Sequence, residues 1–544
     1  TVVVDKMEDN LRNRLMMFIG KFSDKYVLNE RLGKKTPSKD QLHQFSLITW
    51  DNRNDNKIIG RARKLIYVSH NSESEKSAKE LLLDYDDLNK AIKKAEANLY
   101  NYPNRHLETE DVKKLEKAKD DAIAAFLAKM PKVFDPFAGG GAIPLEVSRL
   151  GCNSHGNDIN PVAHIVQKGS CEFPQKFGKP ITFSSEEFTR IYGKEELLKQ
   201  QLEGNVFGEK VNISNRLAFD VKYYCEKVFL DSKNKSANLY GIENDEQEVL
   251  TYHWVREAIC ENKTCAAKIP MLGNFYLSKK RSVSPNEYVF LEPVINNKTI
   301  NFRIKKGQIN NNGWINRGNV TCPICMNITD KVQVKNQYKN NIITERLVAV
   351  LVKNKRDGTR KYNLPSAEEI ENFNNIQEID TNAYLGNIQP CSAGGDTISW
   401  GVDKWKQIFN KRQFTALNCF KENIIEISDS MLNQFQSDYK KAIITYLAIY
   451  FDRVLLRNTS YGTWHLQQET AEHLYGRQSI QMSFDYPEIN MFSSFTNGAF
   501  KQINSIIKVI LNESNIPFWS NIINSASGDK VQFSKKYIDC VVTD

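Results

Sequence analysis

The feature that most constrains this chain is residues 135–141, which read Asp-Pro-Phe-Ala-Gly-Gly-Gly. They follow an apolar pair, Val133 and Phe134, and precede a helical pattern. A second acid, Asp158, lies further on in the segment 157–161, Asn-Asp-Ile-Asn-Pro. A strand, a glycine turn, a helix and then a strand that ends near an acid are typical of an α/β domain that binds a nucleotide-like ligand.

The residues around this turn predict a β-α-β-α order over residues 132–170. Pro144 is tolerated in the first turn of the first helix, and Gly151 ends that helix. Asn160 is expected to cap the second helix, with Pro161 at its first position. The apolar positions of the two helices are Ile143, Val147 and Leu150, then Val162, Ile165 and Val166.

Elsewhere the pattern predicts a helical hairpin, residues 77–99 and 111–130, around a turn at 101–104. A β-hairpin is expected around the turn at 296–298, and the last strand at 538–543. Residues 336–430 give no clear pattern.

The glycine turn differs from a dinucleotide fingerprint. Gly139 and Gly141 fit the first two glycines of that motif, but Pro144 stands where the third is expected. S-adenosylmethionine has no pyrophosphate to be held, so it suits this turn better. Asp135 would then orient the amino group of this cofactor, and Asp158 would accept hydrogen bonds from its ribose hydroxyls. A tight strand-to-helix turn in an unrelated α/β domain is the alternative.

Two close cysteine pairs predict a metal site. Four residues lie between Cys260 and Cys265, and Pro-Ile lies between Cys322 and Cys325. Four thiolates from two such turns suit a closed, structural zinc site rather than a catalytic one. Four unconnected thiols are the alternative.

Composition excludes some classes of protein. There is no run of 18 apolar residues, so no membrane span is expected. Ten cysteines in 544 residues are too sparse for a disulfide scaffold, and the close pairs favour a reducing, cytoplasmic location. The net charge of +9 is compatible with nucleic acid but decides little over this length.

The end of the chain adds a second motif. Val541, Val542 and Thr543 lead to Asp544. D-P-F-x-G-x-G followed later by D-P-P-Y is the motif pair of amino-methyltransferases that act on exocyclic base nitrogens. This chain resembles them in the whole of the first motif and in the Asp of the second. By that resemblance Asp544 is catalytic: its carboxylate accepts hydrogen bonds from the target amine of a flipped base. An ordinary strand that ends in Asp is the alternative.

The wider chain resembles the zinc-ribbon-containing adenine-specific DNA methylases of bacterial phage-defence islands, the type associated with DISARM and BREX-like systems. The stretches that carry the resemblance are 133–177, 260–280, 401–417, 476–492 and 538–544. Two departures are that the Pro-Pro-Tyr after Asp544 and a Trp- and Arg-rich N-terminal segment are absent from this chain. We therefore expect further residues at both ends.

The resemblance implies a Rossmann-like methyltransferase core of α/β class, with a large α+β insertion that carries a zinc ribbon. The expected parts are an N-terminal helical region, the first part of the core, a helical insertion, the zinc ribbon, a recognition-like insertion and the second part of the core: residues 1–130, 131–180, 181–259, 260–335, 336–430 and 431–544.

The resemblance also implies the function and its partners. It predicts a DNA adenine N6-methyltransferase that uses S-adenosylmethionine, acts on double-stranded DNA and marks self DNA beside other proteins of a defence system. Further cofactor contacts would come from Pro136, Phe137, Ala138 and Ile159. Ser525 or Asp529 would contact the adenine ring, although a surface turn explains these two equally well.

Other interpretations stay open at this stage. The motif pair suits any exocyclic amine, so methylation of RNA or of cytosine N4 is an alternative. A catalytically inactive subunit that binds cofactor and DNA is another. The basic run 279–281 contacts phosphates or is simply solvated. The run 477–490 is expected to have a structural role.

Overall fold

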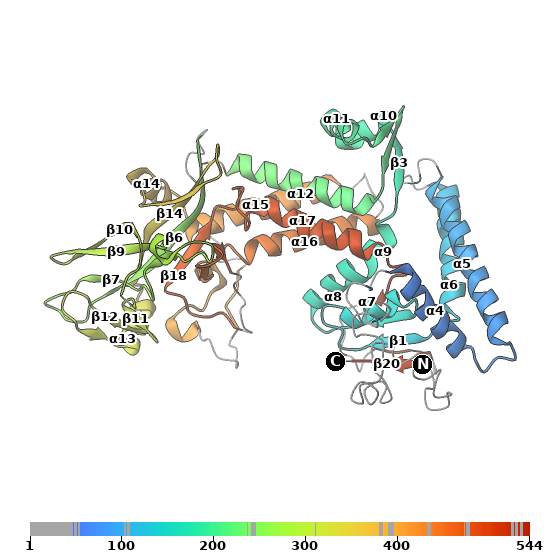
Figure 1. Ribbon diagram of the computed structural model, residues 1–544, viewed down its shortest axis with the longest axis horizontal. Helices are drawn as coiled ribbons and strands as arrows, with labels where there is room; N and C mark the ends of the chain where they lie inside the picture. Colours follow the sequence, from blue (N-terminus) through green and yellow to red (C-terminus); the bar gives the residue numbers. More distant parts are fainter. Residues whose placement is uncertain are drawn as a thin grey trace, which may run out of the picture. The chain divides into compact units, whose positions relative to one another are not determined.

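The computed structural model describes most of the chain after its first 46 residues, and the chain divides into two compact units (Figure 1). The first unit comprises Thr1–Val221, Met431–Tyr446 and Ile507–Asp544, and the second comprises Lys222–Ser430 and Leu447–Ile506. The described residues are 47, 52, 55–102, 105, 109–236, 238–240, 246–310, 312–379, 385–389, 397–431, 437–472, 474, 479–523, 527, 531–533 and 537–543.

A four-stranded sheet, in the order β19-β2-β1-β20, organises the first unit. All its neighbouring pairs are parallel. The strands are β1 (Lys132–Asp135), β2 (Asn153–Gly156), β19 (Asn521–Ile522) and β20 (Cys540–Val541). The helix α7 (Ala142–Arg149) connects β1 to β2, and α8 (Pro161–Gln167) follows β2. The β-α-β-α order expected for residues 132–170 is confirmed, and so is the parallel α/β character.

The edge strand β20 pairs with β1 from a distant part of the chain. In the register of β1 and β20, Phe134 faces Val541. The backbone N–H of Lys132 also donates to the carboxylate of Asp539 at 2.8 Å, across 407 residues. The strand β20 is shorter than the predicted range 538–543. The strand β1 ends at Asp135, and the following Pro136 has no N–H with which to continue a ladder.

A helical hairpin accompanies this sheet, as predicted. It consists of α5 (Ala78–Tyr100) and α6 (Glu110–Leu127), which pack on one another. Ser77 and Glu80 form a capping box at the start of α5. With α4 (Asn56–His70), the hairpin surrounds an aromatic core of Tyr67, Tyr85, Phe126 and Phe518.

The rest of the first unit is a smaller α+β part. A π-helical turn, η3 (Lys168–Glu172), joins α8 to α9 (Phe173–Phe177). An antiparallel sheet, β3-β5-β4, follows together with two short helices. The remaining bounds are β3 Ile181–Ser184, α10 Ser185–Tyr192, α11 Lys194–Leu202, β4 Val206–Phe207 and β5 Lys210–Ile213. The stretch 181–259 is therefore not purely helical as expected, since it also contains these strands and the long strand β6 (Gln247–Ile259).

The second unit is built on an antiparallel sheet in the order β15-β14-β6-β18, with β7 paired to β6. The strand β6 is its buried centre. A separate hairpin of β9 (Val289–Asn296) and β10 (Thr299–Lys306) turns at residues 297–298 and confirms the predicted hairpin. The other strands are β7 Lys268–Pro270, β8 Tyr276–Ser278, β11 Ile315–Asn316, β12 Asn319–Thr321, β13 Ile328–Thr329, β14 Thr344–Asn354, β15 Arg360–Asn363, β16 Trp464–His465, β17 Thr470–Ala471 and β18 Asp485–Ile489.

Helices complete the second unit. Short ones are η4 Pro285–Glu287, α13 Lys331–Lys339, α14 Ala367–Asn374, η5 Ile398–Trp400 and η6 Trp405–Ile408. The long helix α15 Lys411–Ser430 also belongs to it. Three other long helices contain residues of both units: α12 Arg216–Lys235, α16 Ser437–Leu455 and α17 Ala499–Glu513. Among the described residues, no helix combines the length and the apolar character that a membrane crossing needs.

A buried ion pair joins α15 to β18 within the second unit. Arg412 and Glu488 are 1% and 0% exposed and form two hydrogen bonds, of 2.7 and 2.9 Å. Trp254 and Asn410 also donate to Glu488. The run 477–490 therefore contributes a structural anchor, as expected, through Glu488.

We expect Glu488→Ala to destabilise the protein by about 3–5 kcal/mol, because it leaves the Arg412 charge buried without its partner. Urea unfolding followed by circular dichroism measures this. The matched control is Glu292→Ala, which breaks a solvent-exposed pair with Lys305 and should cost less than about 1 kcal/mol. Equal losses in the two variants would contradict the argument.

Candidate functional site

The glycine turn lies at the carboxyl edge of the parallel sheet, directly after β1. Gly139 and Gly141 have φ angles of 49° and 88°, in the left-handed region that glycine adopts readily. The N–H of Gly141 donates to the carbonyl of Ala138 at 2.7 Å and so closes the turn. The turn predicted from the sequence is therefore present, with backbone N–H groups at the start of α7.

Asp135 ends β1 and is 2% exposed. One of its carboxylate oxygens accepts a hydrogen bond from the N–H of Phe137 at 3.1 Å. Its backbone carbonyl accepts from the N–H of Asn157, just after β2. Asp135 is thus held at the point where the chain leaves the sheet and enters the turn.

Asp158 closes the turn from the other side. One carboxylate oxygen accepts from the N–H of Gly139 at 2.8 Å, and the other accepts from the N–H of Asn160 at 2.8 Å. Asp158 is partly exposed. A carboxylate offers about four acceptor positions, so two remain for a ligand.

Two buried amides support the turn and were not identified from the sequence. Asn157 is fully buried, and its backbone carbonyl accepts from the N–H of Ala138 at 2.8 Å. Gln167, at the end of α8, donates from its side chain to the carbonyl of Gly139 at 2.9 Å. A polar residue at a helix position that faces a glycine turn is the only sequence signal for Gln167.

A glycine in β2, Gly156, takes the role of the third glycine that the dinucleotide motif would have at position 144. A Cβ on Gly156 would lie 2.9 Å from Cγ of Pro144. In the dinucleotide motif, a glycine in the helix lets the helix and the strand approach closely. Here a glycine in the strand has that role. Pro144 is accordingly buried in the first turn of α7.

Two apolar side chains beside the turn face solvent. Phe137 is 64% exposed and Ile159 is 69% exposed. Val162, Ile165 and Val166 of α8 are also exposed, so the apolar face of α8 points outward. Exposed apolar side chains beside a polar turn are typical of a ligand-binding surface.

The structure brings together only part of the predicted site. One group of predicted residues lies together at the carboxyl edge of the sheet: 135–139, 141, 158 and 159. Asp544, Ser525 and Asp529 lie outside the described residues. The strand β20 runs parallel to β1, and the N–H of Val542 donates to the carbonyl of Phe134 at 3.0 Å. His164 ties α8 to the end of β19 through a contact of 3.0 Å between its Nδ1 and the carbonyl of Ile523.

We expect Gly141→Ala to destabilise the turn, because its Cβ would lie 2.7 Å from Sγ of Cys171 and its φ is left-handed. Gly140→Ala is the matched control, since nothing lies within 4 Å of its Cβ. Thermal unfolding should show a loss of about 2 kcal/mol or more for Gly141→Ala and less than about 1 kcal/mol for Gly140→Ala. A stable Gly141→Ala protein would show that the turn tolerates a side chain there.

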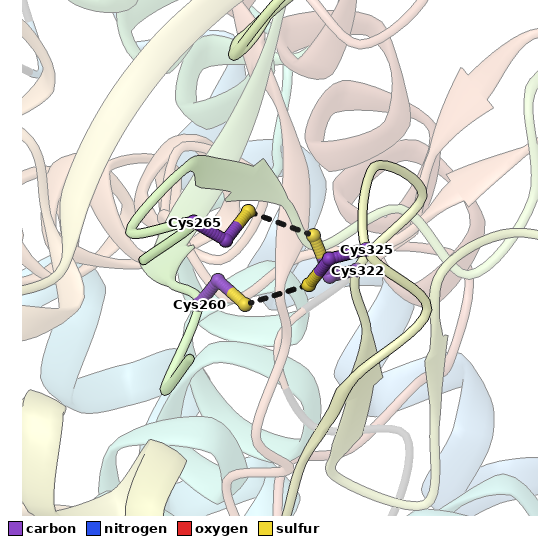
Figure 2. Close-up of side chains that lie close together, drawn as sticks. All are labelled: Cys260, Cys265, Cys322 and Cys325. Carbon is purple, nitrogen blue, oxygen red and sulfur yellow. Dashed lines mark hydrogen bonds between the residues drawn. The ribbon is translucent and has the colours of Figure 1, made fainter. Parts of the chain in front are cut away.

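The four predicted cysteines lie together in the second unit. Cys260, Cys265, Cys322 and Cys325 have their sulfur atoms within 4.8 Å of one another, as Figure 2 shows. The closest sulfur pairs join the two halves: Cys260 to Cys325 at 3.6 Å and Cys265 to Cys322 at 3.8 Å. Four sulfurs bound to zinc at about 2.3 Å lie about 3.8 Å apart in a tetrahedron. The cluster is compatible with zinc.

The two cysteine turns have the same backbone design. In each, the N–H of the first cysteine donates at 2.9 Å to the carbonyl two residues after the second one, Cys260 to Ala267 and Cys322 to Asn327. In each, the residue after the second cysteine is left-handed, with φ of 46° at Ala266 and 60° at Met326.

Both cysteine turns lie at the ends of antiparallel strand pairs. The pair β6–β7 carries the first turn and β12–β13 carries the second. The N–H of Asn327 lowers the pKa of Cys325 to about 7. Burial raises the pKa of Cys260 to about 12, as expected for a thiol that needs a cation to lose its proton.

The basic run 279–281 is engaged within the protein. Lys280 pairs with the buried Glu469 at 2.8 Å. Arg281 donates to the side chain of Gln467 at 2.7 Å, and the ammonium of Lys279 lies 4.0 Å from the ring centroid of Tyr276. A role of Lys280 in phosphate contact is thereby disfavoured.

Comparisons of the chain with models of protein families, with curated proteins and with solved structures found no match.

We expect about one zinc per chain by metal analysis, bound at the four-cysteine cluster. Cys322→Ser should lose most of this zinc and destabilise the second unit, because the two cysteine turns would no longer be joined. Cys419→Ser, at a half-buried cysteine outside the cluster, is the control and should keep its zinc. Full zinc content in the Cys322→Ser protein would count against the site.

Proposed function

We propose that this protein is an S-adenosylmethionine-dependent DNA adenine N6-methyltransferase with a structural zinc site. The observation that carries the proposal is the parallel pairing of β1 with β20. Because parallel strands present their carboxyl ends at one edge, this pairing directs the chain that follows β20 toward the edge where Asp135 lies. The order β19-β2-β1-β20 supports the proposal, because the strand before the second motif lies beside the strand before the first.

The geometry of the turn supports the cofactor assignment. The left-handed Gly139 and Gly141 let a ligand approach the backbone closely. The two free acceptor positions of Asp158 match the two hydroxyls of a ribose. The exposed side chains of Phe137 and Ile159 offer apolar contact to an adenine ring. When bound, the cofactor supplies a methyl group on a positively charged sulfur.

The catalytic step is assigned to Asp544 by the resemblance. Its carboxylate accepts hydrogen bonds from the exocyclic amine of a flipped adenine, and the nitrogen lone pair becomes available for attack on the methyl carbon. As the new N–C bond formed, the bond between the sulfur and the methyl carbon would break and S-adenosylhomocysteine would leave. The proton released by the amine would pass to water. By the same resemblance, the modification marks self DNA beside an anti-phage system.

Full-length protein should convert deoxyadenosine to its N6-methyl form in duplex DNA, detected by nucleoside digestion and mass spectrometry. Asp135→Ala should abolish cofactor binding in calorimetry. The matched control is Asp539→Ala, because the carboxylate of Asp539 also accepts a backbone N–H, that of Lys132, but lies at the opposite end of β1. That variant should bind the cofactor normally.

N4-methylcytosine as the sole product, methylation of RNA only, or absence of any product would each overturn the adenine assignment. Unchanged cofactor affinity in Asp135→Ala would overturn the proposed cofactor site.

A further inference from the structure

A cavity of about 740 Å³ in the second unit carries a concentrated positive charge. Arg317, Lys331 and Lys335 line it, and no acidic residue is among its described lining. Uncharged polar groups come from Ser399 and Gln481. Below, this space is called the basic cavity.

The lysines of the basic cavity are held in place by Trp400. Lys331 and Lys335 lie one turn apart on α13, and their ammonium groups are 5.9 and 5.3 Å from the centroid of the indole ring. Lys335 also donates to the hydroxyl of Ser399 at 2.6 Å. Trp400 is only 6% exposed and packs edge-on against Phe484. Two cations over one fixed ring are oriented before any ligand arrives.

Arg317 lies in a turn whose backbone conformation is unfavourable for arginine. Arg317 and Gly318 form the two-residue loop between β11 and β12, with φ of 51° and 92°. Asn, Asp or Gly is the usual choice at the first of these positions, so an arginine there has a conformational cost. A Cβ on Gly318 would lie 2.9 Å from Cγ of Lys331, so this loop approaches α13 as closely as glycine allows.

The charge of the basic cavity is not neutralised by carboxylates. Within the part of the chain that the structure describes, Arg317, Lys331 and Lys335 form no salt bridge. This differs from the basic run 279–281, where Lys280 pairs with Glu469 at 2.8 Å. Three like charges around one cavity repel one another, and an anion with several oxygens between them would offset this repulsion.

The cavity is built on the second cysteine turn. The strand β12 leads from the Arg317 loop to Cys322, and α13 begins directly after β13. The N–H of Lys331 donates to the side chain of Asn319 at 2.8 Å, which fixes α13 to β12. A metal bound by the cysteines would therefore hold the three cations in their mutual positions.

We propose that the basic cavity binds a backbone phosphate of DNA. The chemistry it recognises is a phosphate group, and the choice of DNA as its source rests on the proposed function. The cavity would fix the register of the duplex on the second unit, since contacts to phosphates position a nucleic acid without selecting its sequence.

The test is DNA binding by full-length protein without cofactor, measured by fluorescence anisotropy of a labelled duplex at several salt concentrations. Arg317→Asn removes one charge and introduces a residue that favours this turn, so folding should be preserved. We expect affinity to fall about eight-fold at 0.1 M salt and the salt slope to fall by about 0.9. Lys331→Gln with Lys335→Gln should lower the slope by about the same amount, because the same phosphate is released.

Arg303→Asn is the matched control, because Arg303 is an exposed cation of β10 outside the cavity. It should change the affinity less than two-fold. Unchanged DNA binding in the Arg317 and lysine variants, or an equal loss in Arg303→Asn, would overturn the proposal.

A second arm distinguishes the source of the phosphate. Inorganic phosphate or ATP at millimolar concentration should not stabilise the wild-type protein against heat more than it stabilises Arg317→Asn. If it does, and DNA binding is independent of the cavity, the site takes a free anion and the assignment to DNA is wrong. Cavity-dependent DNA binding without any methylated product would leave this site standing and overturn only the proposed function.

Discussion

The parallel contact between β1 and β20 is the constraint on which the first unit depends. Parallel strands cannot be joined by a short turn, and here residues 407 apart in the sequence are brought together. Closing such a contact costs chain entropy, which the packing of the intervening segment must offset. The strand beside the glycine turn therefore depends on how the rest of the chain folds.

In the second unit, buried polar side chains and cysteines join elements that are distant in sequence. Glu488 joins α15, β18 and Trp254 of β6 in one buried network. The four cysteines join the strand pairs β6–β7 and β12–β13. Such anchors select one arrangement because a buried charge or thiolate without its partners is costly. An apolar core tolerates more alternatives.

Local signals predicted much of this structure. The turn at Gly139 and Gly141, the helix cap at Asn160 and the hairpin of β9 and β10 each depend on neighbours in sequence, and each is confirmed. The cysteine spacing predicted the cluster, because two short turns suffice to aim four thiols.

Features that depend on contacts between distant segments could not be predicted from the sequence pattern. The closure of the turn by Asp158 depends on where β2 lies beside β1. The space that Gly156 leaves for Pro144 likewise depends on packing between elements. Val162 of α8 is exposed to solvent. Sequence periodicity identifies the apolar face of a helix, but it does not show whether that face is buried.

The junction of β2 with β19 has an evolutionary consequence. These strands meet through their backbones, with Asn521 beside His155 and Ile522 beside Gly156. Backbone pairing places few demands on the side chains or on the length of the loop that connects two strands. The long intervening region can thus change in sequence and in length while the two strands keep their alignment.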